Sequence, residues 1–261
     1  MRRDARCRGV KPWVKVVQTL ATMLILFGAV FLLSCQSLVR SALFYPTHDP
    51  DDKGLAHWMH GGTLIGFARP VADPVNVWLL LHGNGGQAAD RVYALDRFSE
   101  RDAVYILEYP GYGSRAGTPS RKSFDAAALE GYESLRAQFP GKPLCVVTES
   151  IGSGPGSMLA RAAPPPDKLV LIVPFDELKS VAREHAPYLP VGLMLSGSWN
   201  NVEALAGYAG PVDVFGAERD SIIRVAHARR LAASLPQAKF HLIPGGHNDW
   251  SMQSQVSIHN P

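Results

Sequence analysis

Three residues of the chain, Ser150, Asp220 and His247, have the side chains needed for nucleophilic acyl transfer. A serine hydroxyl is a poor nucleophile until an imidazole removes its proton, and a carboxylate must hold that imidazole in the correct tautomer. Each of the three residues comes shortly after an apolar stretch, at residues 144–147, 212–215 and 240–243. We therefore interpret them as a nucleophile, an acid and a base carried on loops that follow strands.

The serine lies in the sequence Thr148-Glu149-Ser150-Ile151-Gly152, a T-x-S-x-G variant of the G-x-S-x-G motif. An apolar run, a sharp turn with small residues and a helical segment at residues 156–163 predict a nucleophile elbow. In such an elbow the serine has a strained backbone and its hydroxyl points out above the sheet edge. The alternative is a glycine-rich connection between a strand and a helix, with a solvated serine.

The remaining chain alternates apolar runs with amphipathic segments, which predicts an α/β fold. We expect a mostly parallel central sheet with helices on both faces, because runs such as residues 75–81 are apolar throughout. The predicted strands are a hairpin at 58–67 and strands at 75–81, 103–107, 144–147, 169–173, 211–215 and 240–243, and the predicted helices are 88–99, 124–139, 156–163 and 225–234. Loops after the carboxyl ends of parallel strands gather at one edge, which would bring the three residues together.

Residues 181–206 contain prolines and several large apolar side chains without a clear period. We interpret this segment as a small cap over that edge of the sheet. Five of its side chains either line an acyl pocket or simply pack the cap: Tyr188, Leu189, Leu193, Met194 and Trp199.

The order serine, aspartate, histidine along the chain is that of the α/β-hydrolases. The developing oxyanion of an acyl transfer needs two backbone N–H donors. We predict that Ile151 supplies one, because it follows the nucleophile, and that Asn84 in the turn at residues 82–86 supplies the other. Two alternatives remain for the acid: Asp176 follows the preceding strand, and Asp220 could instead cap the helix at 225–234.

Six motifs follow one another between residues 42 and 250. They are Leu-His-Gly-Asn-Gly-Gly at 81–86, Tyr-Pro-Gly-Tyr-Gly at 109–113, Ser-Ile-Gly-Ser-Gly at 150–154, Pro-Phe-Asp at 174–176, Arg-Asp-Ser-Ile-Ile at 219–223 and Gly-His-Asn-Asp at 246–249. Together they make the chain resemble the Bem-type (bud-emergence) family of α/β-hydrolases. The chain departs from the family at Thr148, where a glycine is usual, at Arg224, where a proline is usual, and in a short polar tail after Trp250.

The resemblance implies a serine hydrolase that cleaves carboxylic ester or thioester bonds through an acyl-Ser150 intermediate and needs no cofactor. Its substrate would be a small acyl ester, a thioester or a lipid. Three alternatives stay open at this point. The fold could be an inactive scaffold that binds an envelope partner, a peptidase-like relative, or a non-hydrolytic relative.

The first 34 residues have the form of a targeting segment, with a basic start and an apolar core at residues 20–33. The end of this core, Leu-Leu-Ser-Cys at 32–35, resembles the bacterial lipobox, in which the cysteine, here Cys35, is lipidated. We therefore predict a leader at 1–34, a single domain at 35–261, and a lipoprotein of the bacterial cell envelope. If the source is Gram-negative, Gln36 favours the outer membrane, facing the periplasm, because in such lipoproteins an aspartate at this position usually signals inner-membrane retention. The alternative is an uncleaved anchor in the inner membrane.

Charge and cysteine content argue against two other classes of function. The leader holds six of the 26 basic residues and one of the 23 acidic residues, so 20 basic and 22 acidic residues follow it. Such a balance gives no basic stripe for nucleic acid. The three cysteines, Cys7, Cys35 and Cys145, suggest neither a disulfide framework nor a metal cluster, and Cys145 is expected to be a small buried apolar residue.

Overall fold

The computed structural model describes residues 13, 18–24, 26–28, 40–195 and 197–258, without the side chain of Leu193. The chain divides into two units, Met1–Ala42 and Leu43–Pro261. In the first unit, residues 18–24 and 26–28 are helical. None of the described helices combines the length and the apolar character needed to cross a membrane. Cys35, the predicted lipidation site, lies outside the described residues.

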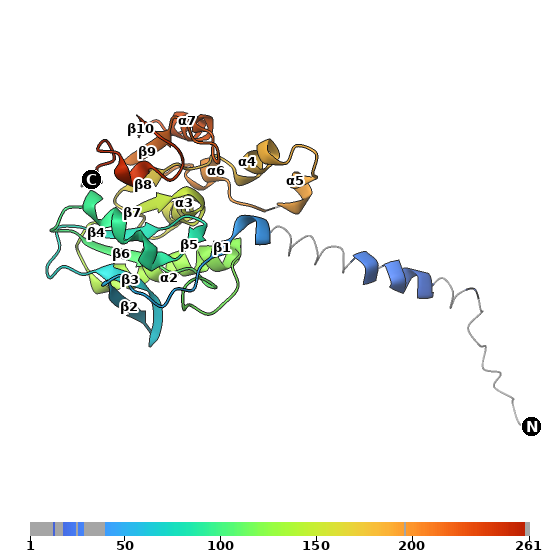
Figure 1. Ribbon diagram of the computed structural model, residues 1–261, viewed down its shortest axis with the longest axis horizontal. Coiled ribbons are helices and arrows are strands. Elements are labelled where there is room, and N and C mark those ends of the chain that lie inside the picture. The colour runs from blue at the N-terminus through green and yellow to red at the C-terminus, as the bar shows by residue number, and fades with distance from the viewer. Residues whose placement is uncertain (1–12, 14–17, 25, 29–39, 196, 259–261) are drawn as a thin grey trace, which may run out of the picture. The chain divides into compact units, whose positions relative to one another are not determined.

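The second unit is built on an eight-stranded sheet (Figure 1). Its strands along the chain are β2 (Ala56–His60), β3 (Thr63–Arg69), β4 (Val77–Leu81), β6 (Ala103–Leu107), β7 (Leu144–Glu149), β8 (Leu169–Ile172), β9 (Val212–Ala217) and β10 (Ala238–Ile243). Their order in the sheet is β10-β9-β8-β7-β4-β6-β3-β2. Only the pairings of β3 with β2 and with β6 are antiparallel. The prediction of a mostly parallel sheet is therefore confirmed.

The central strand β4 shows why its sequence is apolar throughout. All five of its residues are buried, and alternate side chains enter different cores. Leu79 and Leu81 belong to the core on one face of the sheet, while Trp78 and Leu80 belong to the core on the other face. Burial on both faces follows from the helical segments that connect parallel strands.

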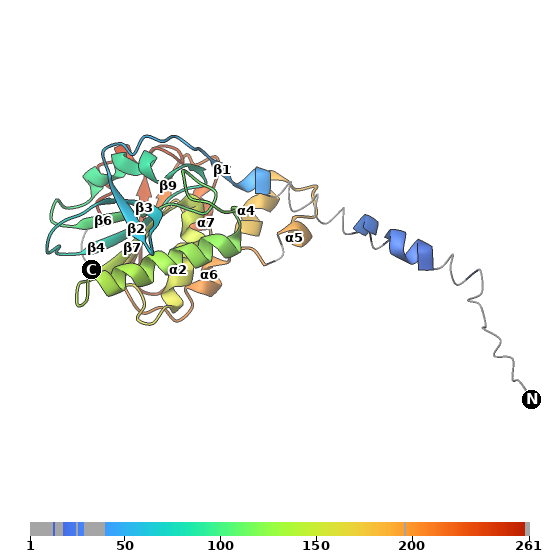
Figure 2. The same ribbon diagram turned by 90° about the horizontal axis from the view of Figure 1, so that it is seen from below.

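Helices α2 (Arg121–Gln138), α3 (Ser153–Met158) and α7 (Val225–Ala233) contribute to the first of these cores. Figure 2 shows α2 lying across this face of the sheet. The helix begins three residues earlier than the predicted start at 124, because the Ser120 side chain accepts a hydrogen bond from the Ser123 N–H and caps it.

The second core is covered by shorter segments. The predicted helix at 88–99 is a 3₁₀ segment, η1 (Ala88–Arg97). A second 3₁₀ segment, η4 (Trp250–Met252), precedes the C-terminal tail. Trp250 is buried in this core, and so are two residues of the polar tail that follows it, Val256 and Ile258. The tail is also joined to η1 by a hydrogen bond from the Ile258 N–H to the Arg97 carbonyl.

Three short helices form the region of the predicted cap, α4 (Leu178–His185), α5 (Val191–Met194) and α6 (Asn201–Ala204), and α4 begins three residues before the predicted start at 181. Its side chains differ widely in exposure. Trp199 is buried, packs near the ring of Phe124 and donates from its indole to Asp125 over 2.7 Å. Tyr188 is 98% exposed, so it lines no pocket in this conformation.

Candidate active site

The structure brings Ser150, Asp220 and His247 into one hydrogen-bonded chain, although they are far apart in sequence. The Nε2 atom of His247 lies 2.8 Å from the Oγ atom of Ser150. The Nδ1 atom of the same ring lies 2.7 Å from the Oδ2 atom of Asp220. A carboxylate can only accept a hydrogen bond, so Nδ1 carries the ring proton and the Nε2 lone pair faces the serine hydroxyl. This is the protonation pattern that a general base requires.

Ser150 occupies a strained turn directly after β7. Its φ angle is 54°, in the left-handed region that residues other than glycine rarely adopt. A β-carbon at Gly152 would collide with the carbonyl oxygen of Leu81 and lie 2.8 Å from that of His82, so only glycine fits there. The sharp turn expected from the sequence is therefore present. Ser150 is only 6% exposed, so it is not the solvated serine of the alternative interpretation.

The loop that carries Asp220 is closed by the aspartate itself. Its Oδ1 atom accepts from the N–H groups of Ile222 and Ile223, at 2.9 and 2.8 Å. Helix α7 begins later, with Arg224 at its N-cap position, so Asp220 is not the cap of that helix. One carboxylate oxygen thus shapes the loop, while the other faces His247.

The histidine loop is fixed by a second acidic residue. The Asp249 side chain accepts from the Gly246 N–H over 2.7 Å. The Arg219 N–H donates to the Gly245 carbonyl over 2.9 Å, which joins the histidine loop to the loop of Asp220. The distance between the aspartate and the histidine is therefore set by backbone contacts as well as by their own hydrogen bond.

Asp176, the alternative acid, contacts a different histidine. Its carboxylate lies 2.5 Å from Nδ1 of the fully buried His227 and accepts from Arg230 over 2.6 Å. Burial alone would raise the pKa of Asp176, but the hydrogen bonds from His227 and Arg230 hold that pKa well below its ordinary value. The structure thus separates the two aspartates that the sequence left as alternatives.

Asn84 lies in a loop whose peptide groups are held from several sides. The His82 ring contacts the Gly83 carbonyl through Nδ1 over 2.7 Å. In a trans peptide the N–H points opposite to the carbonyl, so the Asn84 N–H points away from His82. The Asn84 carbonyl accepts from the Tyr45 N–H and the Tyr112 hydroxyl, over 2.9 and 2.8 Å. The loop conformation therefore fixes the direction of this N–H.

A buried ion pair that the sequence analysis did not single out lies beside the elbow. Glu149, directly before Ser150, accepts from Arg91 Nε over 3.0 Å and from the Gly83 N–H over 3.2 Å. Burial alone would raise the pKa of Glu149, but the charge of Arg91 lowers it below its ordinary value. The sequence signal for this pair was a glutamate at the end of a strand whose other residues, apart from Thr148, are apolar.

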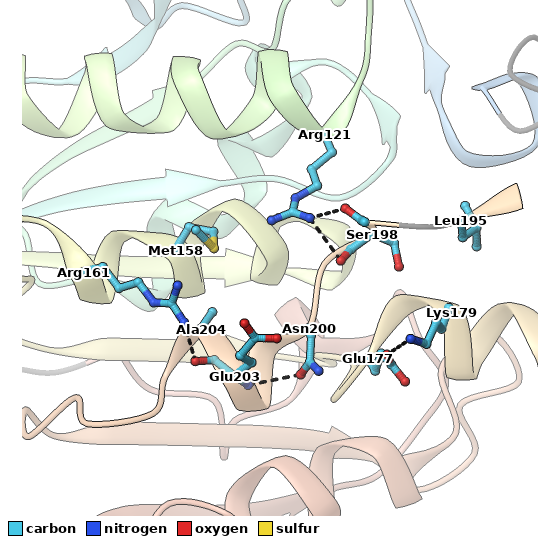
Figure 3. A pocket seen from close by; sticks show the side chains of 11 residues that line it. Arg121, Met158, Arg161, Glu177, Lys179, Leu195, Ser198, Asn200, Glu203 and Ala204 are labelled. Carbon is cyan, nitrogen blue, oxygen red and sulfur yellow. Dashed lines mark hydrogen bonds and ion pairs between the residues drawn. The ribbon is translucent and has the colours of Figure 1, made fainter. Parts of the chain in front are cut away.

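A cavity of about 250 Å³ lies between α2, α3 and the cap (Figure 3). Three cations line it, and each contacts groups beside the cavity. Arg121 donates to the backbone carbonyls of residues 197 and 198, Arg161 to that of residue 203, and Lys179 pairs with the side chain of residue 177. None of Ser150, Asp220 and His247 lines this cavity, so it is separate from the candidate active site. In the described part of the chain, no cluster of three or more histidine, cysteine or acidic side chains is arranged to hold a metal ion.

Comparison with known proteins gives distant relatives. No protein-family model matches the chain. The chain is 28% identical over 268 residues to the uncharacterised protein Rv2307c of Mycobacterium tuberculosis, covering 94% of this chain and 90% of that protein. It is 27% identical over 184 residues to the lysophosphatidylserine lipase ABHD12 of Danio rerio and 29% identical over 182 residues to that of Mus musculus. These matches cover 62% and 57% of this chain but only 48% and 46% of the lipases, so the chain matches about half of their length.

Solved structures show the fold. The esterase Est1E from Butyrivibrio proteoclasticus superposes with a TM-score of 0.60 at 14% identity, covering 74% of this chain and 90% of Est1E. A thioesterase domain from the curacin biosynthetic pathway superposes with a TM-score of 0.55 at 16% identity, covering 75% of this chain and 93% of that domain. The chain therefore has the α/β-hydrolase fold and is a distant homologue of Rv2307c and of the ABHD12 lipases.

Proposed function

We propose that the protein is a serine hydrolase that cleaves carboxylic ester or thioester bonds. The observation that carries this proposal is the hydrogen-bonded chain from Ser150 through His247 to Asp220, at 2.8 and 2.7 Å. Such a chain activates a serine hydroxyl for attack on a carbonyl carbon. The positive φ angle of Ser150 and the distant homology to lipases add support.

In the proposed reaction, Ser150 Oγ attacks the acyl carbon while Nε2 of His247 takes the hydroxyl proton. Asp220 holds the resulting imidazolium, and the N–H groups of Ile151 and Asn84 bind the oxyanion. The tetrahedral intermediate collapses when His247 returns its proton to the leaving alcohol or thiol. Water, activated by the same imidazole, then attacks the acyl-Ser150 ester and releases the acid.

The substrate class we propose is an acyl ester or thioester with a lipid-like acyl group. Two curated relatives are named lysophosphatidylserine lipases, which supports a lipid ester over a peptide bond. Labelling with a fluorophosphonate and hydrolysis of p-nitrophenyl esters of several chain lengths test the proposal together. We expect labelling at Ser150 and hydrolysis of at least one ester, and a protein that neither labels nor hydrolyses would be a binding scaffold instead.

We further propose that the enzyme is tethered to a membrane of the bacterial cell envelope through its N-terminal segment. The basic residues before residue 16, the apolar core at 20–33 and Cys35 support this. Metabolic labelling with a palmitate analogue separates the two possible tethers. A lipoprotein incorporates label that Cys35→Ala removes, whereas an uncleaved anchor incorporates none and stays in the membrane fraction.

A further inference from the structure

Glu149 and Arg91 are charged side chains placed where burial is costly. The side chains of both are only 8% exposed. Buried ion pairs give little net stability, because the cost of removing two charges from water offsets their attraction. Stability alone therefore does not account for a buried pair at this position beside Ser150.

The hydrogen bonds of the pair end on the backbone at both sides of Asn84. Glu149 accepts from the Gly83 N–H, and Arg91 Nη2 donates to the Gly85 carbonyl over 2.8 Å. A third nitrogen of the guanidinium, Nη1, donates to the Gln87 carbonyl over 3.4 Å. The pair thus connects the strand that carries the nucleophile with the peptide groups that flank the proposed oxyanion donor.

The glycines of this loop leave its position to contacts from other segments, and the pair adds to the contacts that Tyr45 and Tyr112 make with the Asn84 carbonyl. Gly83, Gly85 and Gly86 have no side chains that could anchor the loop, and glycine backbones are conformationally free. Two of them pack directly against the pair. A β-carbon at Gly83 would lie 3.3 Å from the Glu149 carboxylate, and one at Gly86 would lie 2.6 Å from Arg91 Nη1.

We propose that Arg91 and Glu149 are positioning residues that hold the loop of Asn84 in register with Ser150. They touch no reacting atom and act through the N–H groups that bind the oxyanion. The inference rests on the proposed serine hydrolase function, because an oxyanion forms only in such a reaction. Groups displaced by about 1 Å can slow a reaction on the order of 10²-fold, so a loosened loop should reduce turnover.

The test is a double variant, Arg91→Met with Glu149→Gln, which removes both charges and leaves neither unpaired. We expect kcat per fluorophosphonate-titrated site to fall about 10- to 100-fold on a p-nitrophenyl ester, with KM changed less than about twofold. Affinity for a trifluoromethyl ketone, which forms an oxyanion on the enzyme, should fall in parallel with kcat/KM. The melting temperature should stay within a few degrees, because the pair adds little net stability.

A matched control pair lies at the amino-terminal ends of the parallel strands, whereas Ser150 follows the carboxyl end of β7. Lys168 and Asp213 form a largely buried ion pair at 2.9 Å, where β8 and β9 begin. The double variant Lys168→Met with Asp213→Asn should leave kcat per titrated site unchanged. Should the Arg91 and Glu149 double variant fail to fold, Arg91→Lys keeps the charge but not the fork of donors, and its kcat should still fall.

The outcomes separate this inference from the proposed function. If the wild type neither labels nor hydrolyses, the proposed function fails. If the wild type is active while the variant keeps wild-type kcat per titrated site, only the positioning role is wrong. A variant that merely melts earlier, with kcat per titrated site unchanged, would likewise show a purely structural pair.

Discussion

The Cγ2 methyl group of Thr148 fills the space over the α-carbon of Gly156. A β-carbon at Gly156 would collide with this methyl group, and Thr148 itself is fully buried. A threonine where related motifs have glycine is therefore accommodated by a glycine in α3, across from the strand. Among the described residues, the Thr148 hydroxyl has no hydrogen-bond partner. The side chain thus acts through its shape.

This packing predicts a reciprocal effect of two substitutions. Gly156→Ala should destabilise the fold by about 1–3 kcal/mol, since overpacking of a core costs that much. Thr148→Gly should also destabilise, by roughly 1–3 kcal/mol, because it leaves a cavity and a freer unfolded chain. The double variant should lose less free energy of unfolding than the two single variants lose in sum. Urea unfolding of the wild type, both single variants and the double variant measures this difference. Additive effects would contradict the contact.

Thr148→Val tests whether the hydroxyl matters to catalysis. Valine keeps the shape and removes a polar group that lacks a partner, so stability should hold or rise. Turnover of a short-chain ester should stay within about twofold of the wild type. A strong loss of turnover with valine, and rescue by Thr148→Ser, would show instead that the hydroxyl positions the elbow.

Ser150→Ala should abolish fluorophosphonate labelling and lower ester hydrolysis on the order of 10⁴- to 10⁶-fold. The hydroxyl accounts for little packing, and alanine at a positive φ is no more strained than serine, so the melting temperature should hold. Circular dichroism and a thermal melt provide the control for folding. Near-normal turnover in this variant would refute the proposed nucleophile.

Asp220→Asn should reduce kcat about 10⁴-fold, because an amide neither fixes the tautomer of His247 nor stabilises its imidazolium. Asp176→Asn is the matched control. Its carboxylate pairs with His227 and Arg230, so its loss should lower stability while leaving kcat per titrated site nearly unchanged. A larger loss of kcat in Asp176→Asn than in Asp220→Asn would show that Asp176, after the preceding strand, is the acid.

Asp176 should also make stability depend on pH at the acidic end. Hydrogen bonds from His227 and Arg230 outweigh burial and lower its pKa in the folded state, so the unfolded chain binds the proton more readily. The contribution is fully present above the unfolded pKa of about 3.9 and is lost as pH falls towards the lower folded pKa. Between pH 5 and pH 3, the free energy of unfolding measured with urea should therefore fall more for the wild type than for Asp176→Asn. Equal losses would mean that the aspartate titrates alike in both states.

The strands and their order in the chain follow from the sequence because parallel strands buried on both faces need continuous apolar runs. Strand β6 has the predicted bounds, Ala103–Leu107, and β4 and β8 differ from prediction by one or two residues. The residue types of the candidate site were also evident, since a serine among small residues directly after an apolar strand is typical of a nucleophile elbow. Local patterns suffice for these features because each depends on a short stretch of chain.

Contacts between distant residues needed the tertiary structure. Asp176 and Asp220 both follow strands at one edge of the sheet. The packing of α7 places His227 against Asp176, and His247 contacts Asp220. The pairing of Arg91 with Glu149 joins residues 58 positions apart, which no local period reveals. Burial of Ser150, which is only 6% exposed, likewise does not follow from its local sequence. Side-chain partners across such distances are decided by how the layers pack, because the sequence constrains which faces are apolar but not which polar groups meet.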